Sequence, residues 1–317
     1  MTKKIISIDG GGMYGVIPVE VCIAIEKKLQ QSLKETFDLF VGTSTGSLIC
    51  SAALRGLKEK KSFGLSAEEI MNIYIDSAET IFGKDAENRL QFKYPILNEG
   101  KYPKYSSQGL EDVANSVFGA ITQSSKIYQA EKKLIITSYN TTKKEPCLFT
   151  SWGKDKEIEL KQAVIASCSA PQTHHKYKIE TNNSDYTDGG VFAGNPALIA
   201  YSEAKAEWGD EDMVLISLGT GIPKYKTEST SGDDIKWWIK NIFKIILDGQ
   251  EESTHNALTQ IASNPKNKLQ YFRFNCDVED KKADEIDRNV LEKAREIMRT
   301  ELKNESATFE KMISALK

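Results

Sequence analysis

Residues 42–46 read Gly-Thr-Ser-Thr-Gly, a G-x-S-x-G pentapeptide between a predicted strand and a predicted helix. Such a turn needs its flanking glycines, and it raises the serine hydroxyl onto the N-terminus of the helix. There the helix dipole and the free backbone N–H groups favour an attacking oxygen or a developing oxyanion. Ser44 is therefore the candidate nucleophile, with a chance match in a turn rich in Gly and Ser as the alternative.

Gly10, Gly11 and Gly12 follow the first predicted strand, within the segment Asp-Gly-Gly-Gly-Met-Tyr-Gly. Three consecutive glycines bring backbone N–H groups close to a ligand without Cβ obstruction, and could bind a phosphate or the oxyanion of acyl transfer. The segment also satisfies G-x-G-x-x-G, so a dinucleotide-binding oxidoreductase is a rival. That reading needs an acid about 20 residues on, at the end of the second strand. Glu35 and Asp38 lie at or before the start of that strand, which argues against it.

A nucleophilic serine needs a proton acceptor, and the sequence has three histidines, the adjacent His174 and His175 and the isolated His255. Ser44, Asp188 and His255 follow the chain order of an α/β-hydrolase triad. Asp188 alone is the better partner, because two glycines follow it and leave its carboxylate unobstructed. A carboxylate within hydrogen-bond reach of a serine can act as the base without histidine. We therefore predict that Ser44 and Asp188 form a pair, with a plain Asp-Gly-Gly turn as the alternative.

Together these segments resemble the patatin-like phospholipase family. Residues 9–15 look like its oxyanion loop, residues 42–46 like its nucleophile elbow, and residues 188–190 like the motif that carries the second half of a Ser–Asp dyad. Three shorter segments are also similar: Ala-Ser-Cys-Ser-Ala-Pro at 166–171, Gly-Asn-Pro at 194–196 and Leu-Gly-Thr-Gly at 218–221. All of them occur in the family's order along the chain.

The resemblance implies a three-layer α/β/α fold with a mainly parallel central sheet. Residues 1–225 would form a patatin-like lipid acyl hydrolase core, and residues 226–317 a mostly helical extension packed on the same domain. Two positions depart from the family pattern, because Tyr14 stands where the family usually has Arg or Lys, and Gly194 where it usually has Asn. The first bears on the support of the glycine loop, and the second on the turn behind the Asp-Gly-Gly motif.

The resemblance also implies a role for each site residue. Ser44 would be the nucleophile, Asp188 its base, and the backbone amides of Gly10, Gly11 and Gly12 would bind the oxyanion. Attack on a lipid ester gives an acyl-enzyme that water hydrolyses, as in a phospholipase A. This chemistry needs no metal and no organic cofactor.

The expected substrate is a membrane phospholipid met at the inner face of a membrane. Some compact bacterial relatives are anti-phage effectors activated by cyclic nucleotides, so the resemblance suggests a gated effector of that kind here. Two other classes stay open. One is a non-catalytic lipid-binding or scaffold protein, and the less favoured one is the dinucleotide-dependent oxidoreductase. A homo-oligomer also remains open.

The composition of the 317-residue chain, 40% hydrophobic and 27% charged, is ordinary for a folded protein and excludes a disordered chain. With 42 basic and 45 acidic residues, the net charge of -3 gives no overall basic field for a nucleic-acid polymer. Five dispersed cysteines indicate reduced thiols rather than a disulfide framework or a zinc site. No apolar stretch is long enough for a signal peptide or a membrane span, so we expect a cytoplasmic protein that acts peripherally on a membrane.

Short apolar runs alternate with longer amphipathic ones, which is typical of an α/β protein. Residues 82–107 read as an irregular excursion, and Ser66 and Glu69 form a capping box at the start of a helix. The predicted strands are residues 4–8, 38–41, 134–138, 147–150 and 213–217. The predicted helices are residues 16–33, the segment from the pentapeptide to residue 57, and residues 66–81, 160–166, 196–207, 234–247 and 283–316.

The predicted helix at residues 234–247 has one stripe of lysines, at 236, 240 and 244, and is apolar elsewhere. A helix that lies in the surface of a membrane has this pattern, and so does a helix packed into the domain with one edge exposed to solvent. We expect packing, in which case Trp237 and Trp238 could still line the acyl channel. The charged segment from Ala283 onward is expected to be a solvated surface or an oligomer contact.

Overall fold

The computed structural model describes residues 2–55, 64–82, 105–119, 126–130, 132–171, 173–224, 235–279 and 284–317. Within these ranges the side chains of residues 128, 235–241, 243 and 244 are outside the description. Most of the predicted excursion, residues 83–104, and the predicted helical residues 56–57 also lie outside the described residues.

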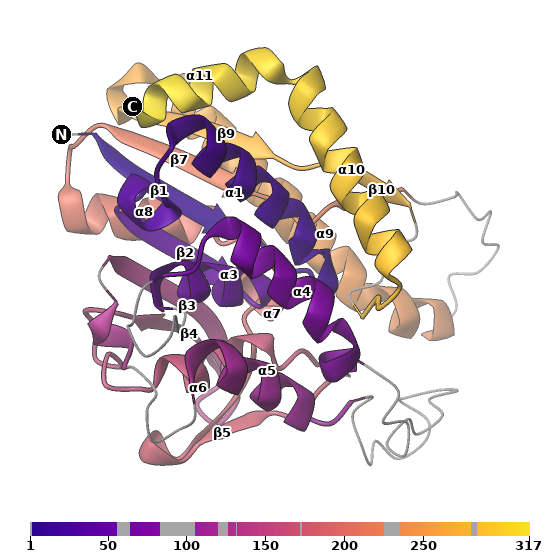
Figure 1. Ribbon diagram of the computed structural model, residues 1–317. Helices are drawn as coiled ribbons and strands as arrows, with labels where there is room; N and C mark the ends of the chain where they lie inside the picture. The colour runs from indigo at the N-terminus through magenta and orange to yellow at the C-terminus, as the bar shows by residue number, and fades with distance from the viewer. Residues whose placement is uncertain are drawn as a thin grey trace.

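A mixed eight-stranded sheet runs through the centre of the molecule (Figure 1). Five strands pair in parallel in the order β3-β2-β1-β7-β9, while β4 and β6 pair antiparallel with β3, and β5 pairs antiparallel with β6. A separate parallel pair is formed by β8 and β10. The strands are β1 (Lys3–Ile8), β2 (Leu39–Thr43), β3 (Lys133–Asn140), β4 (Glu145–Thr150), β5 (Tyr177–Ile179), β6 (Ser184–Asp188), β7 (Met213–Leu218), β8 (Ile222–Lys224), β9 (Leu269–Phe274) and β10 (Asp277–Glu279).

Helices cover both faces of this sheet (Figure 1). Successive strand residues point to opposite faces, so Ile6 and Ile8 join a large core with α1, α3, α4, α5 and α6, whereas Ile5 joins a smaller core with α8 and α9. The predicted α/β architecture with a mainly parallel sheet is thereby confirmed. The helices are α1 (Val16–Leu29), α2 (Leu33–Thr36), α3 (Thr45–Arg55), α4 (Ala67–Phe82), α5 (Gln108–Phe118), α6 (Leu160–Cys168), α7 (Gly190–Ala193), α8 (Ala197–Trp208), α9 (Ile235–Ser263), α10 (Arg288–Asn304) and α11 (Ser306–Leu316).

The helix predicted over residues 16–33 is too long, because α1 ends at Leu29. Gln30 then adopts a left-handed φ of 55°, which ends the helix without a glycine. Ser32 begins α2 with a capping box, in which its hydroxyl accepts from the Glu35 N–H while the Glu35 carboxylate accepts from the Ser32 N–H. The polar residues between α1 and α2 therefore end the first helix and cap the second, rather than continuing one helix.

Two other predicted helices differ from the structure. The helix predicted at residues 234–247 is the first half of α9, which continues to Ser263. The helix predicted at residues 283–316 is two helices, α10 and α11, which meet at Glu305. The sequence pattern also does not predict α5 or β9. β9 ends the described sheet order, and its residues Leu-Gln-Tyr-Phe-Arg-Phe include Gln270 and a buried cation, Arg273, so they lack the short apolar run of the other parallel strands.

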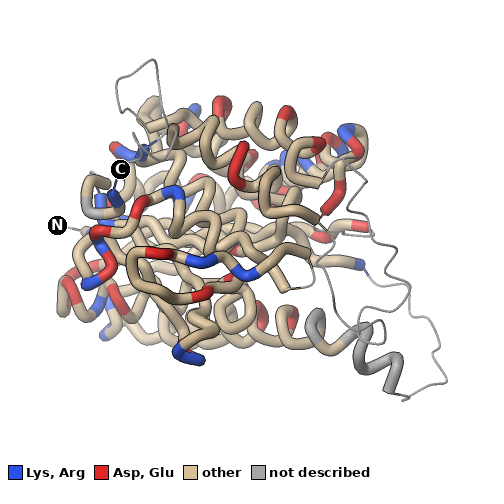
Figure 2. Tube along the Cα trace, turned by 90° about the horizontal axis from the view of Figure 1, so that it is seen from below, with Lys and Arg blue, Asp and Glu red and all other residues tan. Residues whose placement is uncertain are grey.

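The C-terminal elements pack against the first elements of the chain. Beyond β7, β9 extends the sheet, and α10 and α11 lie beside α1 (Figure 1). The Lys4 ammonium donates a hydrogen bond to the carbonyl of Leu316, so the two ends of the chain lie side by side. Acidic and basic residues are interspersed along the outer helices and loops (Figure 2). A division of the chain at residues 225 and 226 stays a prediction.

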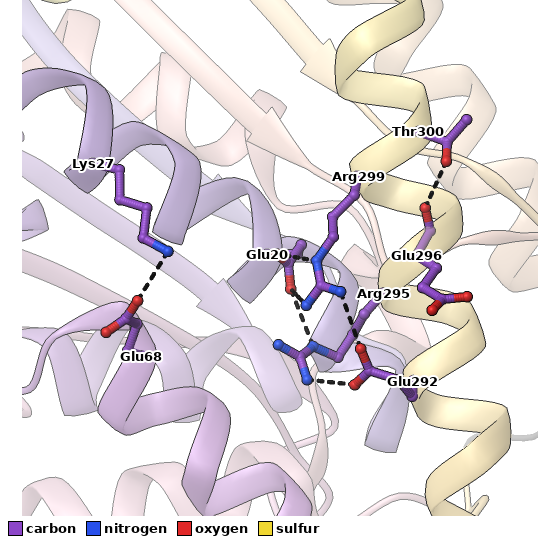
Figure 3. A network of polar contacts seen from close by, with 8 residues as sticks. All are labelled: Glu20, Lys27, Glu68, Glu292, Arg295, Glu296, Arg299 and Thr300. Carbon is purple, nitrogen blue, oxygen red and sulfur yellow. Dashed lines mark hydrogen bonds and ion pairs between the residues drawn. The ribbon is translucent and has the colours of Figure 1, made fainter.

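Glu20 joins α1 to α10 through a cluster of charges (Figure 3). Its carboxylate accepts from Arg295 Nε at 3.1 Å, and from Arg299 Nε and Nη2 at 2.8 and 3.2 Å. Glu292 pairs with the same two guanidinium groups at 2.5 and 3.0 Å. The Glu20 side chain is only 9% exposed, so these bonds replace hydration that it loses on folding.

We expect Glu20→Gln to lower the free energy of unfolding by about 1–3 kcal/mol, because two partly buried arginines lose a shared carboxylate. Urea unfolding followed by circular dichroism measures this change. Glu68→Gln is the matched control, since Glu68 pairs with Lys27 at the surface, where both side chains are about two-thirds exposed (Figure 3). The control is expected to change stability by less than about 0.5 kcal/mol. Equal effects in the two variants would contradict the structural role given to Glu20.

Candidate active site

The ends of β2 and β6 meet on one edge of β3, and β4 occupies the other edge. Thr43, the last residue of β2, pairs with Thr137, and Asp188, the last residue of β6, pairs with the next β3 residue, Ser138. Since β2 is parallel to β3 and β6 is antiparallel to it, the two strands approach this point from opposite directions. Ser44, which follows Thr43, is thereby brought beside Asp188 although 144 positions separate them in the sequence.

Ser44 lies in the sharp turn that the pentapeptide predicts. Its φ of 53° is in the left-handed region, which costs a non-glycine residue on the order of 1 kcal/mol. A Cβ on Gly46 would lie 2.1 Å from the Ile8 carbonyl oxygen, and a Cβ on Gly42 would lie 2.4 Å from the Gly46 carbonyl carbon. Both glycines of the motif are therefore needed, because strand and helix approach too closely for any side chain.

The end of α6 and the residue after it hold both members of the pair. The Ser44 N–H donates to Ser167 Oγ at 2.9 Å, and the Asp188 N–H donates to the Ser169 carbonyl at 3.0 Å. Cys168 lies between these two serines, and burial together with the negative charge of Asp188 raises the pKa of its thiol to about 12. At neutral pH this thiol is protonated, so it is not a competing nucleophile.

Asp188 is 5% exposed, and its Oδ1 accepts from the Gly190 N–H at 2.7 Å. Burial raises its pKa from about 3.8 to about 6, while hydrogen bonding from the Ser44 hydroxyl and from the Gly190 N–H opposes part of this rise. Above pH 6 the group is an ionised carboxylate that is more basic than a solvated one. It therefore has the protonation state and the position of a general base for Ser44.

The glycine loop follows β1 and lies across from Ser44. The Gly10 N–H donates to the Gly194 carbonyl at 3.0 Å, so this amide is already engaged. In the described part of the chain, the amides of Gly11 and Gly12 have no hydrogen-bond acceptor. A Cβ on Gly11 would lie 2.1 Å from Thr220 Oγ1, so glycine is required there. Because the Gly10 amide is already engaged, we assign the oxyanion role predicted for three amides to those of Gly11 and Gly12 as a proposal.

One cavity of about 340 Å³ brings all five predicted site residues together. Ser44, Asp188 and the three loop glycines lie on its wall. The remaining wall is mainly apolar and includes the carboxylates of Asp248 and Glu251. It consists of Phe82, Cys168, Ala170, Pro171, Thr173, His174, Gly190, Gly194, Gly221, Pro223, Leu247, Asp248 and Glu251. A volume of this size and an apolar lining suit a small apolar ligand or part of a lipid chain.

The three histidines fall in different places. His255 is on α9, where its Nδ1 lies 3.2 Å from the Tyr271 hydroxyl, and it is not among the described residues that line the cavity. His174 does line the cavity and packs against Phe82 and Tyr105. Burial, with a smaller contribution from His175, lowers its pKa to about 4, so the ring is neutral at physiological pH. The geometry thus offers Ser44 a carboxylate partner, not the predicted alternative with His255.

The first half of α9, which carries the predicted lysine stripe, reaches the cavity at its C-terminal end. Leu247 and Asp248 line the cavity, whereas the side chains of Trp237 and Trp238 lie outside the described residues. Their place in an acyl channel stays a prediction. Among the helices that the structure describes, none is long and apolar enough to cross a membrane.

Comparison with known proteins places the chain in a family. The sequence model of the family described as "Patatin-like phospholipase" matches residues 6–201. "Patatin-like protein 2" of Arabidopsis thaliana is 30% identical over 268 residues, covering 75% of this chain and 64% of that protein. "Patatin group J-1" and "Probable inactive patatin-3-Kuras 1" of Solanum tuberosum are each 28% identical over 74% of this chain, covering 64% and 67% of those proteins.

The chain belongs to the patatin-like phospholipase family. It spans only about two-thirds of the length of several of these relatives. One relative is named inactive, so family membership alone does not establish catalysis.

Proposed function

We propose that the protein is a phospholipase A-type lipid acyl hydrolase in which Ser44 is the nucleophile and Asp188 its base. The observation that carries this proposal is the meeting of the two side chains in one apolar cavity, opposite the unengaged amides of Gly11 and Gly12. The left-handed backbone of Ser44 adds support, because nucleophile elbows hold their serine in this strained turn.

In the proposed reaction, Asp188 takes the proton of the Ser44 hydroxyl as Oγ attacks the ester carbonyl carbon. The N–H groups of Gly11 and Gly12 donate to the oxyanion that forms on the carbonyl oxygen. The intermediate collapses to an acyl-enzyme, and Asp188 returns the proton to the departing alcohol. Water then attacks the acyl group with Asp188 as base, and Asp188 returns that proton to Ser44 Oγ as the fatty acid leaves.

Because Asp188 must be ionised to accept the proton, the initial rate should rise with pH through about 6 and level off above it. The rise follows a single ionisation, since the nearby His174 is already neutral in this range, with a pKa of about 4. Initial rates on a soluble short-chain ester between pH 4.5 and 8.5 measure the profile. A midpoint below pH 5 would contradict the raised basicity of Asp188.

The proposed site of action is a membrane surface, at the cytoplasmic face. Ile242, Ile245 and Ile246 occupy one face of α9, and each is 41–43% exposed. Ile222, on β8, is 49% exposed. Leu247 and Pro223, next to these residues in the chain, line the cavity. Apolar side chains around the cavity mouth would let the protein rest on a bilayer while a lipid enters the cavity.

An unregulated phospholipase would damage the membranes of its own cell, so the proposal includes a gate. A cyclic nucleotide is the activator that the family resemblance suggests, in a gated anti-phage role. The test is fatty-acid release from mixed phosphatidylcholine and phosphatidylglycerol vesicles, with and without a panel of cyclic di- and trinucleotides.

Wild type, Ser44→Ala and the surface control Ser116→Ala are compared in this assay. Release by wild type and Ser116→Ala, abolished in Ser44→Ala, is the expected result. Release that needs a nucleotide would identify the gate. Equal release by all three proteins would exclude Ser44 as the nucleophile. Vesicle binding without release under any condition would favour the lipid-binding or scaffold alternative.

A further inference from the structure

A buried ion pair lies directly behind the glycine loop. Asp9, the residue before Gly10, is 0% exposed, and its Oδ2 lies 2.6 Å from Arg273 Nη2. Strand β9 lies beside β7, which lies beside β1 (Figure 1). Arg273 is on β9, and its guanidinium donates from Nη1 to Ser217 Oγ on β7 at 2.7 Å and from Nη2 to Asp9 just beyond β1. Burial is the largest single influence and lowers the pKa of the Arg273 guanidinium, but the charge and hydrogen bond of Asp9, together with Tyr271 and Glu251, raise it overall. The group is therefore charged at every physiological pH.

The loop depends on contacts of this kind because its own residues have no side chains to pack. Its first residue is fixed on both sides, since the Gly10 N–H donates to the Gly194 carbonyl and the Thr220 hydroxyl donates to the Gly10 carbonyl at 2.6 Å. The Asp9 N–H donates to the Leu218 carbonyl at 3.0 Å. Of these contacts, only the one between Asp9 and Arg273 joins two full charges. Its partner on β9 is also farther along the chain than Gly194, Leu218 and Thr220, which make the other contacts.

These contacts come largely from the C-terminal part of the sheet. Ser217 and Thr220 follow residue 201, where the family match ends, and so does Arg273. The side chains that hold the loop from behind therefore lie outside the segment that the family model recognises, although the loop itself lies inside it.

We propose that Arg273 is a positioning residue for the oxyanion site. By holding Asp9, it fixes the path of the next three residues, so that the Gly11 and Gly12 amides face the carbonyl oxygen on which negative charge develops as Ser44 attacks. Small displacements of such donors matter, because an oxyanion site works only when its N–H groups already point at the developing charge. This inference rests on the proposed function of Ser44 and of the loop.

Three variants separate positioning from simple charge balance. Arg273→Met keeps a long side chain and removes the positive charge. Arg273→Lys keeps the charge but loses the guanidinium that donates to both Asp9 and Ser217. The double variant Asp9→Asn/Arg273→Met removes both charges. Arg295→Met is the matched control, because Arg295 is also mostly buried and ion-paired, at 15% exposure, but belongs to the Glu20 cluster (Figure 3). If Arg273→Met does not fold, the lysine and double variants carry the test.

The first readout is steady-state kinetics on a short-chain ester, together with the rate at which a fluorophosphonate labels Ser44. Arg273→Met is expected to lower kcat and the labelling rate about 10- to 100-fold, with KM changed by less than about threefold. Arg273→Lys should recover part of the loss. The double variant should remain as slow as Arg273→Met, because the neutral pair no longer ties Asp9 to β9. Arg295→Met should keep wild-type kcat and KM.

The second readout is hydrogen–deuterium exchange of peptides that cover residues 9–15, which does not need activity. Exchange there should be faster in Arg273→Met and in the double variant, and unchanged in Arg295→Met. Wild-type kcat and wild-type loop exchange in the double variant would overturn the proposal, because the pair would then only balance charge. If wild type neither hydrolyses esters nor labels Ser44, the proposed function fails, and the exchange comparison alone decides the role of Arg273.

Discussion

Replacing Asp188 with asparagine should abolish lipid hydrolysis and, at the same time, make the protein more stable at neutral pH. Asparagine keeps an oxygen that can accept from the Gly190 N–H, now at 2.7 Å from Asp188 Oδ1, but it cannot take the proton of Ser44. We expect hydrolysis to fall at least about 10³-fold, as when other members of a nucleophile–base pair are removed.

The gain in stability follows from the raised pKa of this carboxyl group. Its pKa is about 6 in the folded protein and near 3.8 in an unfolded chain, so the folded state holds the proton more tightly. The stabilising contribution of the protonated form is present below pH 4 and is lost as pH rises through 6. Above pH 6 the buried charge costs at most about 3 kcal/mol, which asparagine removes.

Urea unfolding of wild type and Asp188→Asn at pH 4.5 and pH 7.5 measures the effect. The variant should be more stable at pH 7.5, and its advantage should shrink at pH 4.5. Asp185→Asn is the control on the same strand, because its side chain is 40% exposed and should change stability little at either pH. A variant less stable than wild type at pH 7.5 would show that burial of Asp188 is not a net cost.

The site and its strained turn were accessible from the sequence because their signals are local. Ser44, with its two glycines, and Asp188, with the two that follow it, each occupy one short segment whose turn geometry the residue types dictate. The register that joins them, through Thr137 and Ser138 of β3, is not local. Spacing and periodicity do not relate these two segments across 144 positions, so their pairing was predicted from the residue types and from the family resemblance.

Other features could not be predicted, because they depend on partners far away in the chain. The engagement of the Gly10 amide depends on Gly194, and the ion pair behind the loop joins Asp9 to Arg273 across 264 positions. Because Arg273 stands among the alternating residues of β9, the sequence alone indicates a surface strand. Only the structure shows that the buried carboxylate of Asp9 is its partner. The end of α1 at Gln30 is different in kind, because a non-glycine residue in a left-handed conformation has only a weak sequence signal.

Gly46→Ala should have the largest effect on folding, although it adds only one methyl group. That carbon would lie 2.1 Å from the Ile8 carbonyl oxygen and 2.7 Å from the Ile8 carbonyl carbon, both in the backbone of β1. Neither atom belongs to a flexible side chain, so α3 and β1 would have to separate. We expect the free energy of unfolding to fall by about 3 kcal/mol or more, or the variant not to fold.

The matched control is Gly249→Ala, in the exposed part of α9, where an added Cβ meets nothing within 4 Å. Alanine there should raise stability by up to about 1 kcal/mol, because it is the better helix former. Thermal unfolding of the two variants compares them directly. Opposite signs would show that the second glycine of the G-x-S-x-G motif is required by the contact between α3 and β1. A Gly46→Ala protein as stable as wild type would mean that the helix can shift away from β1, and the close approach beneath Ser44 would not be essential to the fold.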